Sequence, residues 1–193
     1  MPVSPRVIML NGASSSGKSS LQRAIQALLP DPWLSFSVDD LIAAMPTAML
    51  EADGGFAVGL DGEVTVGARF IDLNIAWEHG IAAMAGAGAP VIVDDVLLRG
   101  RAGQERWNVA LGDLAVLWVG VHCDVAELLR RERSRGDRRI GMAADQAPLV
   151  HVGVEYGLEV DTTHQTSEQC AARIVAHLGE STTWLVGSPL RDG

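Results

Sequence analysis

Lysine is almost absent from this sequence, which contains one, Lys18, beside fourteen arginines in 193 residues. Cysteine is also scarce: Cys123 and Cys170 are the only two, and they make neither a disulfide framework nor a zinc-binding spacing. The longest apolar run, residues 80–93, is interrupted by glycines and a proline and is too short to cross ~30 Å of hydrocarbon. These absences exclude a disulfide-rich secreted domain and a protein that spans a membrane through helices. Since no signal peptide is evident either, they predict a cytoplasmic chain.

Positive charge is scarce as well. The chain has 24 acidic and 15 basic residues, a formal net charge of −9, and a pI of about 4.9. A negative field of this kind repels phosphate backbones, so we expect no nucleic-acid partner. The length predicts a single domain, residues 1–178, followed by a tail without periodicity, residues 179–193. The sequence leaves the oligomeric state open, and a homo-oligomer is compatible with it.

Short apolar strands alternate with amphipathic helices along the chain. This alternation predicts a three-layer α/β fold in which a five-stranded parallel sheet is flanked by helices, with ligands at the carboxyl ends of the strands. An Asp-Gly turn predicts a hairpin insert over residues 56–66. Thr166 and Gln169 have the spacing of a capping box at the start of the last helix. The predicted strands cover residues 6–10, 34–38, 91–93, 114–121 and 158–160, and the predicted helices cover residues 18–29, 69–87, 125–133, 139–150 and 168–178.

A phosphate-binding motif, G-x-x-x-x-G-K-[ST], occupies residues 12–19, between the first predicted strand and the first predicted helix. The glycines let the backbone curl so that successive N–H groups point at a phosphate. The lysine reaches the β- and γ-phosphates, the serine hydroxyl binds Mg²⁺, and the helix N-terminus adds positive charge. The motif predicts a site for a nucleoside triphosphate formed by Gly12, Ala13, Ser14, Ser15, Ser16, Gly17, Lys18, Ser19 and Ser20.

Asp94 and Asp95 follow a buried predicted strand, where P-loop proteins place a carboxylate for Mg²⁺. Because side chains alternate along a strand, only one of the two is expected to face the phosphates, and Asp94 is favoured. The alternative is an ordinary turn at the strand end. The predicted metal-binding residues are therefore Ser19 together with Asp94 or Asp95.

Asp39 and Asp40 end the second predicted strand. A carboxylate there lies near the γ-phosphate and can accept a proton from a substrate hydroxyl during transfer. Asp40 is expected to cap a short helix over residues 41–45, which leaves Asp39 to face the site. The sequence thus predicts Asp39 as the catalytic base.

Arginines gather in residues 130–139, a segment of net charge +4 in an acidic chain. Arg130 and Arg131 are adjacent on a predicted helix and are expected to lie on its solvated face. Arg135 and Arg138 lie on either side of Gly136, which can act as a hinge. We expect these two to belong to a lid, about residues 130–140, that closes over the triphosphate and stabilises the charge of the transferred group.

The chain resembles the chloramphenicol phosphotransferases over about residues 6–178. The resemblance rests on sequence strings rather than on the motif alone: Ile8-Met9-Leu10-Asn11-Gly12, Pro32-Trp33-Leu34, Ile92-Val93-Asp94-Asp95-Val96, Gln104-Glu105-Arg106-Trp107, Leu117-Trp118-Val119-Gly120-Val121 and Arg135-Gly136-Asp137-Arg138. It implies a P-loop kinase fold like that of the nucleoside monophosphate kinases. It also implies transfer of the γ-phosphate of ATP to the primary (C-3) hydroxyl of chloramphenicol, with Asp39 as base and Arg135 and Arg138 as lid arginines.

Three other functions compete with this one. A GTPase switch needs a guanine-reading Asn-Lys-x-Asp, which the single lysine excludes. A nucleotide-dependent nucleic-acid enzyme is disfavoured by the negative charge. A kinase for shikimate, gluconate or a nucleotide remains the main alternative. Its anionic acceptor would need basic residues near the second strand, whereas residues 34–68 contain no Arg or Lys, which favours a neutral hydroxylated acceptor.

Overall fold

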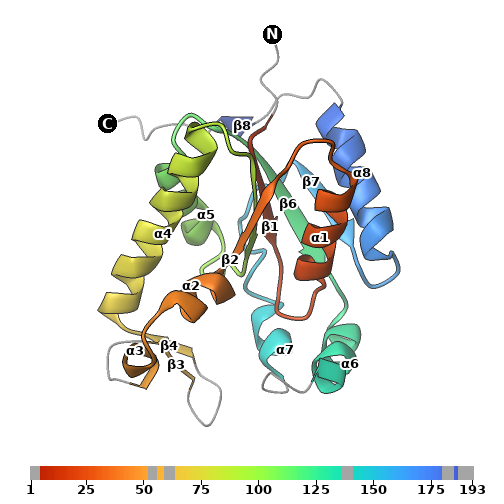
Figure 1. The fold of residues 1–193 in the computed structure, drawn as a ribbon. Helices are drawn as coiled ribbons and strands as arrows, with labels where there is room; N and C mark the ends of the chain where they lie inside the picture. Colours follow the sequence, from red (N-terminus) through yellow and green to blue (C-terminus); the bar gives the residue numbers. More distant parts are fainter. Residues whose placement is uncertain (1–4, 52–55, 59–63, 136–140, 180–184, 187–193) are drawn as a thin grey trace.

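The computed structural model describes residues 5–51, 56–58, 64–135, 141–179 and 185–186. Strands and helices alternate along these segments, as expected from the sequence (Figure 1). The strands are β1 Val7–Asn11, β2 Leu34–Ser37, β3 Phe56–Val58, β4 Val64–Val66, β5 Val91–Asp95, β6 Ala115–His122, β7 Leu158–Asp161 and β8 Leu185–Val186; the helices are α1 Lys18–Leu28, α2 Val38–Ala44, α3 Thr47–Glu51, α4 Ala68–Gly86, α5 Arg101–Leu111, α6 Val125–Arg135, α7 Met142–Gln146 and α8 Ser167–Gly179.

A parallel sheet in the order β2-β5-β1-β6-β7 forms the centre of the molecule. Figure 1 shows α1 and α8 on one side of it and α4 and α5 on the other. Both faces of β1 and β5 are covered, so their apolar residues follow one another, at 7–10 and 91–93, rather than alternating with polar ones. The predicted five-stranded parallel sheet flanked by helices is confirmed.

The two faces carry separate apolar clusters. On one face, Leu21 and Ile25 of α1 pack with Ile174 of α8 against the sheet. On the other face, Ile81 of α4 and Trp107 of α5 pack against residues of β1, β5 and β6. All five side chains are at most 2% exposed, so burial of both sheet faces is the main stabilising contribution.

The start of α2 differs from the prediction. The second strand ends at Ser37 rather than Val38, and α2 begins at Val38, so the prediction that Asp39 and Asp40 end the strand is wrong. The physical reason is a capping box: the Ser37 side chain accepts from the backbone N–H of Asp40, whose carboxylate accepts from the N–H of Ser37 at 2.7 Å. Asp39 therefore lies in the first turn of a helix.

Three further elements depart from the predicted boundaries. The helix expected over residues 139–150 is shorter, because α7 ends at Gln146 and turns lead up to and past Pro148. The buried strand expected to end at Val93 continues through Asp95. The tail, for which no element is predicted, contains β8, which pairs antiparallel with the first residues of β6.

At the hairpin predicted over residues 56–66, β3 and β4 pair antiparallel, and the turn between them lies outside the described residues. Figure 1 shows this pair with α2 and α3 beyond the carboxyl ends of the strands, with α6 and α7 across from them. Within the described segments, no helix is both long enough and apolar enough to cross a bilayer.

Candidate active site

The phosphate loop, residues 12–17, leaves the carboxyl end of β1 and turns back into α1. Gly12 passes so close to β6 that a Cβ atom there would collide with the carbonyl oxygen of Val121. Gly17 has a φ of 90°, a left-handed conformation that residues with a side chain rarely adopt. A close approach at one end of the loop and a left-handed turn at the other therefore account for both glycines of the motif.

The single lysine of the chain is the first residue of α1, and only 5% of Lys18 is exposed. Its Nζ donates to the carbonyl oxygens of Gly12 at 2.8 Å and Ala13 at 2.9 Å, and lies 3.4 Å from Oδ1 of Asp94. A compact ammonium group on a flexible stem suits this confined position better than a planar guanidinium. This confinement is a physical reason for lysine here in a chain that otherwise uses arginine.

Two polar groups of the loop have no protein partner among the described residues. The Oγ atoms of Ser15 and Ser16 are both buried and make no hydrogen bond there. Beside them lie the Lys18 ammonium group and the N-terminus of α1, which no side chain caps. Buried hydroxyls, a cation and a helix N-terminus in one place suit the oxygens of a polyphosphate. The residues present therefore fit the triphosphate of ATP.

A hydroxyl and a carboxylate meet at the rim of the loop, where the Oγ of Ser19 donates to Oδ2 of Asp94 at 2.9 Å. Asp95 is engaged elsewhere, since its Oδ2 accepts from Nε1 of Trp107 at 2.6 Å and its Oδ1 from the N–H of Val96 at 2.6 Å. The structure thus brings Asp94, and not Asp95, to the phosphate loop.

Oxygen atoms of this kind are the ligands that Mg²⁺ prefers. In the part of the chain that the structure describes, no three His, Cys, Asp or Glu side chains gather as a ready-made metal cage. A Mg²⁺ ion held by Ser19 and Asp94 would therefore take most of its ligands from phosphate oxygens and water, which is how Mg²⁺ is usually bound beside nucleotides.

Asp39 is exposed in the first turn of α2. The sheet register pairs Ser37, which precedes α2, with Asp94 of β5. Gln22 of α1 fixes the same end of β2, because its Nε2 donates to the carbonyl oxygen of Phe36 at 3.1 Å. Asp39 therefore lies two residues after Ser37, the sheet neighbour of Asp94. This places it at the carboxyl ends of the strands, where the phosphate loop also lies.

Only part of the arginine-rich segment is described. Arg138 and the side chain of Arg135, the two predicted lid arginines, lie outside the described residues. Arg130 is exposed, and its guanidinium is bound to Glu127 at 2.6 Å, in agreement with a solvated helix face. The lid prediction therefore stays a prediction.

Arg131 does not lie on a solvated face, so that prediction is wrong. Its guanidinium turns toward the sheet and donates to the carbonyl oxygen of Thr162 at 2.6 Å and, at 3.4 Å, to that of Ser15 in the phosphate loop. Glu127, one turn earlier on α6, holds the Nε of Arg131 at 2.8 Å. Spacing alone could not separate Arg131 from Arg130, because adjacent helical residues point in different directions and the neighbouring loops decide which one is inward.

Two further residues that the sequence analysis missed contact the loop. The Oε1 of Gln146 accepts from the N–H of Ser14 at 2.7 Å, and the Oγ1 of Thr162 donates to the carbonyl oxygen of Ser16 at 2.7 Å. Thr162 directly follows β7, so the rule that selected the aspartates, polar residues at strand ends, would have found it. No sequence signal singles out Gln146.

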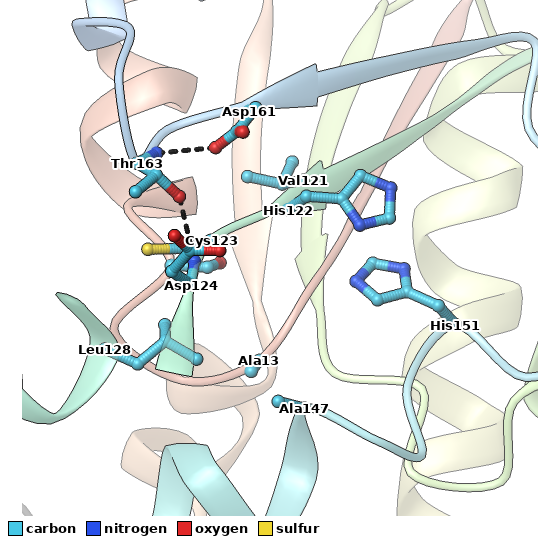
Figure 2. Close-up of a pocket in the computed structure, with 11 residues that line it drawn as sticks. Ala13, Val121, His122, Cys123, Asp124, Leu128, Ala147, His151, Asp161 and Thr163 are labelled. Carbon is cyan, nitrogen blue, oxygen red and sulfur yellow. Dashed lines mark hydrogen bonds between the residues drawn. The ribbon is translucent and has the colours of Figure 1, made fainter. Parts of the chain in front are cut away.

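A pocket of about 200 Å³ lies beside the outer face of the phosphate loop, lined in part by Ala13, Ser16, His122, His151 and Asp161. Figure 2 shows the two imidazole rings side by side, and their centroids are 4.2 Å apart. Burial, helped by the neighbouring His122, lowers the pKa of His151 to about 4, so this ring is neutral at physiological pH.

A hydrogen-bonded chain links this pocket to the start of the loop. His151 Nδ1 lies 2.7 Å from the hydroxyl of Tyr156, whose pKa is raised by burial to about 12, and the same hydroxyl accepts from Nδ2 of Asn11 at 2.5 Å. Asn11 also donates to the carbonyl oxygen of Val150 at 2.7 Å. The last residue of β1 is thereby fixed just before the loop begins.

The sheet order, the phosphate loop and the arrangement of Lys18, Ser19 and Asp94 define a class of enzyme, the P-loop kinases that phosphorylate small molecules. The model of the family described as "Chloramphenicol phosphotransferase-like protein" matches residues 5–179. The chain belongs to this family.

Relatives agree with this assignment. In two strains of Mycobacterium tuberculosis, the protein named "Putative O-phosphotransferase" is 33% identical over an alignment of 170 residues that covers 82% of this chain and 75% of that protein. Among solved structures, a sugar kinase from a Janibacter species is 16% identical with a TM-score of 0.64, covering 91% of this chain and 95% of its own. The Mycobacterium tuberculosis APS kinase CysC is 12% identical with a TM-score of 0.61, and the match covers 93% of this chain and 100% of the kinase. At these identities the two structures show the fold alone.

Proposed function

We propose that this kinase transfers the γ-phosphate of ATP, with Mg²⁺, to the primary (C-3) hydroxyl of chloramphenicol or of a similar neutral hydroxylated molecule, and so inactivates the antibiotic. The observation that carries the proposal is the contact of Lys18 and Ser19 with Asp94 at a phosphate loop whose buried serine hydroxyls lack protein partners. Membership of the chloramphenicol phosphotransferase-like family supports this acceptor over others.

The residues divide the work between the nucleotide and the acceptor. The backbone N–H groups of the loop and Lys18 hold the β- and γ-phosphates. Ser19 and Asp94 would hold Mg²⁺, which when bound would neutralise charge on the phosphates. Asp39, two residues after the sheet neighbour of Asp94, orients the acceptor hydroxyl and takes its proton as the phosphoryl group moves. Arg135 and Arg138 are assigned to the lid that closes over the transferred group.

In this mechanism both substrates bind at the carboxyl ends of the strands, and the acceptor hydroxyl attacks the γ-phosphate in line with the bond that breaks. The loop fixes the γ-phosphate at the carboxyl end of β1, and the acceptor approaches from the side of β2 and α2. Holding the reacting atoms in this order converts an encounter of two molecules into a step within one complex, and most of the catalysis of phosphoryl transfer comes from such positioning and from charge stabilisation.

Mass spectrometry of chloramphenicol incubated with the protein, ATP and Mg²⁺ tests the proposal directly. We expect a mass gain of one phosphoryl group. Asp39→Asn should lower turnover by about 10²–10⁴-fold while ATP binding stays nearly unchanged, because the amide cannot accept the proton. Asp40→Asn is the matched control. It removes the same charge from the next residue, whose carboxylate serves the capping box.

Each outcome identifies a different part of the proposal. If Asp39→Asn turns over at a near-normal rate, Asp39 is not the base. If no phosphorylated chloramphenicol forms while ATP still binds, the kinase site stands and the acceptor assignment fails. A screen of shikimate, gluconate, nucleotides and neutral hydroxylated compounds then finds the acceptor.

A further inference from the structure

The phosphate loop contains a residue in a conformation that its side chain disfavours. Ser15 has a φ of 60°, and it is the only residue other than glycine with a positive φ in the described part of the chain. A left-handed conformation costs a residue with a Cβ atom free energy, and such conformations persist where the surroundings hold them. The loop therefore needs contacts from outside to keep the shape that binds phosphate.

Side chains from three other elements supply those contacts on three consecutive residues. Gln146 of α7 accepts from the N–H of Ser14 at 2.7 Å, just before the strained residue. Thr162, after β7, donates to the carbonyl oxygen of Ser16 at 2.7 Å, just after it. The carbonyl oxygen of Ser15 itself receives the longer contact from Arg131 described above.

Gln146 is the contact with the firmest support. Gln146 is 9% exposed. If its amide were removed, the N–H of Ser14 would therefore be left without a partner in a place that water hardly reaches. The helix that carries Gln146 is itself anchored, because the fully buried carboxylate of Glu132 accepts from the N–H groups of Gly141 at 2.8 Å and Ala143 at 2.7 Å. A rigid α7 therefore places the amide oxygen against the loop.

We propose that Gln146 is a positioning residue that holds Ser14 and the strained Ser15 in the conformation that binds the phosphates of ATP. It acts through the loop backbone and touches neither substrate in this proposal. The inference rests on the proposed nucleotide site but not on the identity of the acceptor.

The test measures the binding of Mg²⁺·ATP to the full chain by calorimetry, with no acceptor present. Gln146→Leu keeps roughly the volume of the side chain and removes its amide group, and we expect ATP affinity to fall about tenfold, the effect of one buried hydrogen bond. Gln104→Leu is the matched control: this glutamine is also buried, but its amide binds the backbone of Glu155 away from the loop. It should leave ATP affinity unchanged.

Repeating the substitution in a Ser15→Gly protein separates positioning from general stability. Glycine adopts a positive φ without strain, so Gln146→Leu should then weaken ATP binding by about twofold or less. Rescue of this kind is not expected from a residue that merely stabilises the fold.

The proposal is overturned if Gln146→Leu binds ATP as well as the parent at an unchanged melting temperature. It is also overturned if Gln104→Leu weakens ATP binding equally, or if the loss of affinity is the same with and without Ser15→Gly. Failure to phosphorylate chloramphenicol leaves it untouched, whereas absence of ATP binding by the parent protein overturns both proposals.

Discussion

At the scale of single residues, the site depends on a carboxylate that serves two neighbours. Asp94 is 8% exposed, and its two oxygens face different groups: Oδ1 lies 3.4 Å from the Lys18 ammonium and Oδ2 accepts from Ser19 at 2.9 Å. A buried cation and a buried anion stabilise each other only while both are present. Asp94 therefore contributes to the placement of Lys18, and we expect it to serve a Mg²⁺ ion at Ser19 as well.

Asp94→Asn should raise the Mg²⁺ concentration needed for half-maximal activity by about tenfold or more, because a neutral amide replaces an anionic ligand or ligand partner. Asp95→Asn removes the same charge from the adjacent residue, which is bound to Trp107, and should leave the Mg²⁺ dependence unchanged. Initial rates at saturating ATP over a Mg²⁺ titration measure both. Equal shifts in the two variants would contradict the assignment of the metal to Asp94.

The sequence narrows the proposed metal carboxylate to two adjacent residues and favours Asp94, but it does not show what turns Asp95 away. Alternation along a strand says that Asp94 and Asp95 point in opposite directions, but the partner that engages Asp95, Trp107, comes from a helix whose docking is a tertiary event. The same limit applies to Arg131 and Gln146, whose contacts with the loop come from α6 and α7. Residues inside a local motif can thus be predicted, and residues that support it from distant elements cannot.

At the scale of elements, α4 and α5 are joined by an ion pair between a buried glutamate and a partly exposed arginine. Glu78 of α4 is 1% exposed, and Arg106 of α5 reaches it with distances of 2.7–3.0 Å. Burial raises the pKa of Glu78, and Arg106 opposes that increase. The docking of the two helices therefore depends on the arginine, because without it the buried carboxylate keeps a hydrogen bond from Asn74 at 2.7 Å but loses the positive charge beside it.

Arg106→Met should lower the free energy of unfolding at pH 7.5 by about 1–3 kcal/mol, less than for a fully buried pair because 36% of the Arg106 side chain is exposed. Without Arg106 the pKa of Glu78 in the folded state rises further above its value in the unfolded state. At any pH between these two pKa values, the folded state binds more protons than the unfolded state. Stability then falls as pH rises through that range, and the deficit of the variant should shrink when the pH is lowered toward 5. Urea unfolding at both pH values measures this. A deficit that is independent of pH would contradict the argument.

Arg101→Met is the control for that measurement. Arg101 pairs with Glu105 on the same helix at 2.9 Å, but both side chains are more than 60% exposed. Such surface pairs are weakened by water and salt, so this substitution should leave the unfolding midpoint nearly unchanged.

Regular elements follow from the sequence better than their ends do. Buried strands of the parallel sheet have a strong apolar pattern, and the prediction of five parallel strands flanked by helices is confirmed, whereas the helix α5 was not predicted. The start of α2 was misplaced because the Ser37 cap competes with the strand that precedes it, and α7 was predicted too long because Pro148 and the turns around it end the helix early. β8 was missed because two residues have no period, and only the free edge at the start of β6 gives them a partner.

At the scale of the whole molecule, charge favours one kind of acceptor. The net charge is −9, and residues 34–68, which run from β2 to the start of α4 beside the proposed acceptor side, contain no lysine or arginine. A negative field lowers the local concentration of anions and leaves neutral molecules unaffected. ATP overcomes this field through the loop, Lys18 and Mg²⁺, whereas an anionic acceptor on the β2 side would meet Asp39 and Asp40 with no described cation on α2 or α3 to balance them.

Neutral hydroxylated acceptors should therefore be phosphorylated with a kcat/KM at least about tenfold higher than gluconate or shikimate at low salt, where steering by charge is strongest. Raising the ionic strength from about 0.01 M to about 0.15 M shortens the screening length, so the rate with anionic acceptors should rise relative to the neutral ones. Coupled assays of ADP release with chloramphenicol, gluconate and shikimate at both ionic strengths give the comparison. If an anionic acceptor is the best substrate at low salt, basic groups outside residues 34–68 must bind it, and the argument from net charge fails.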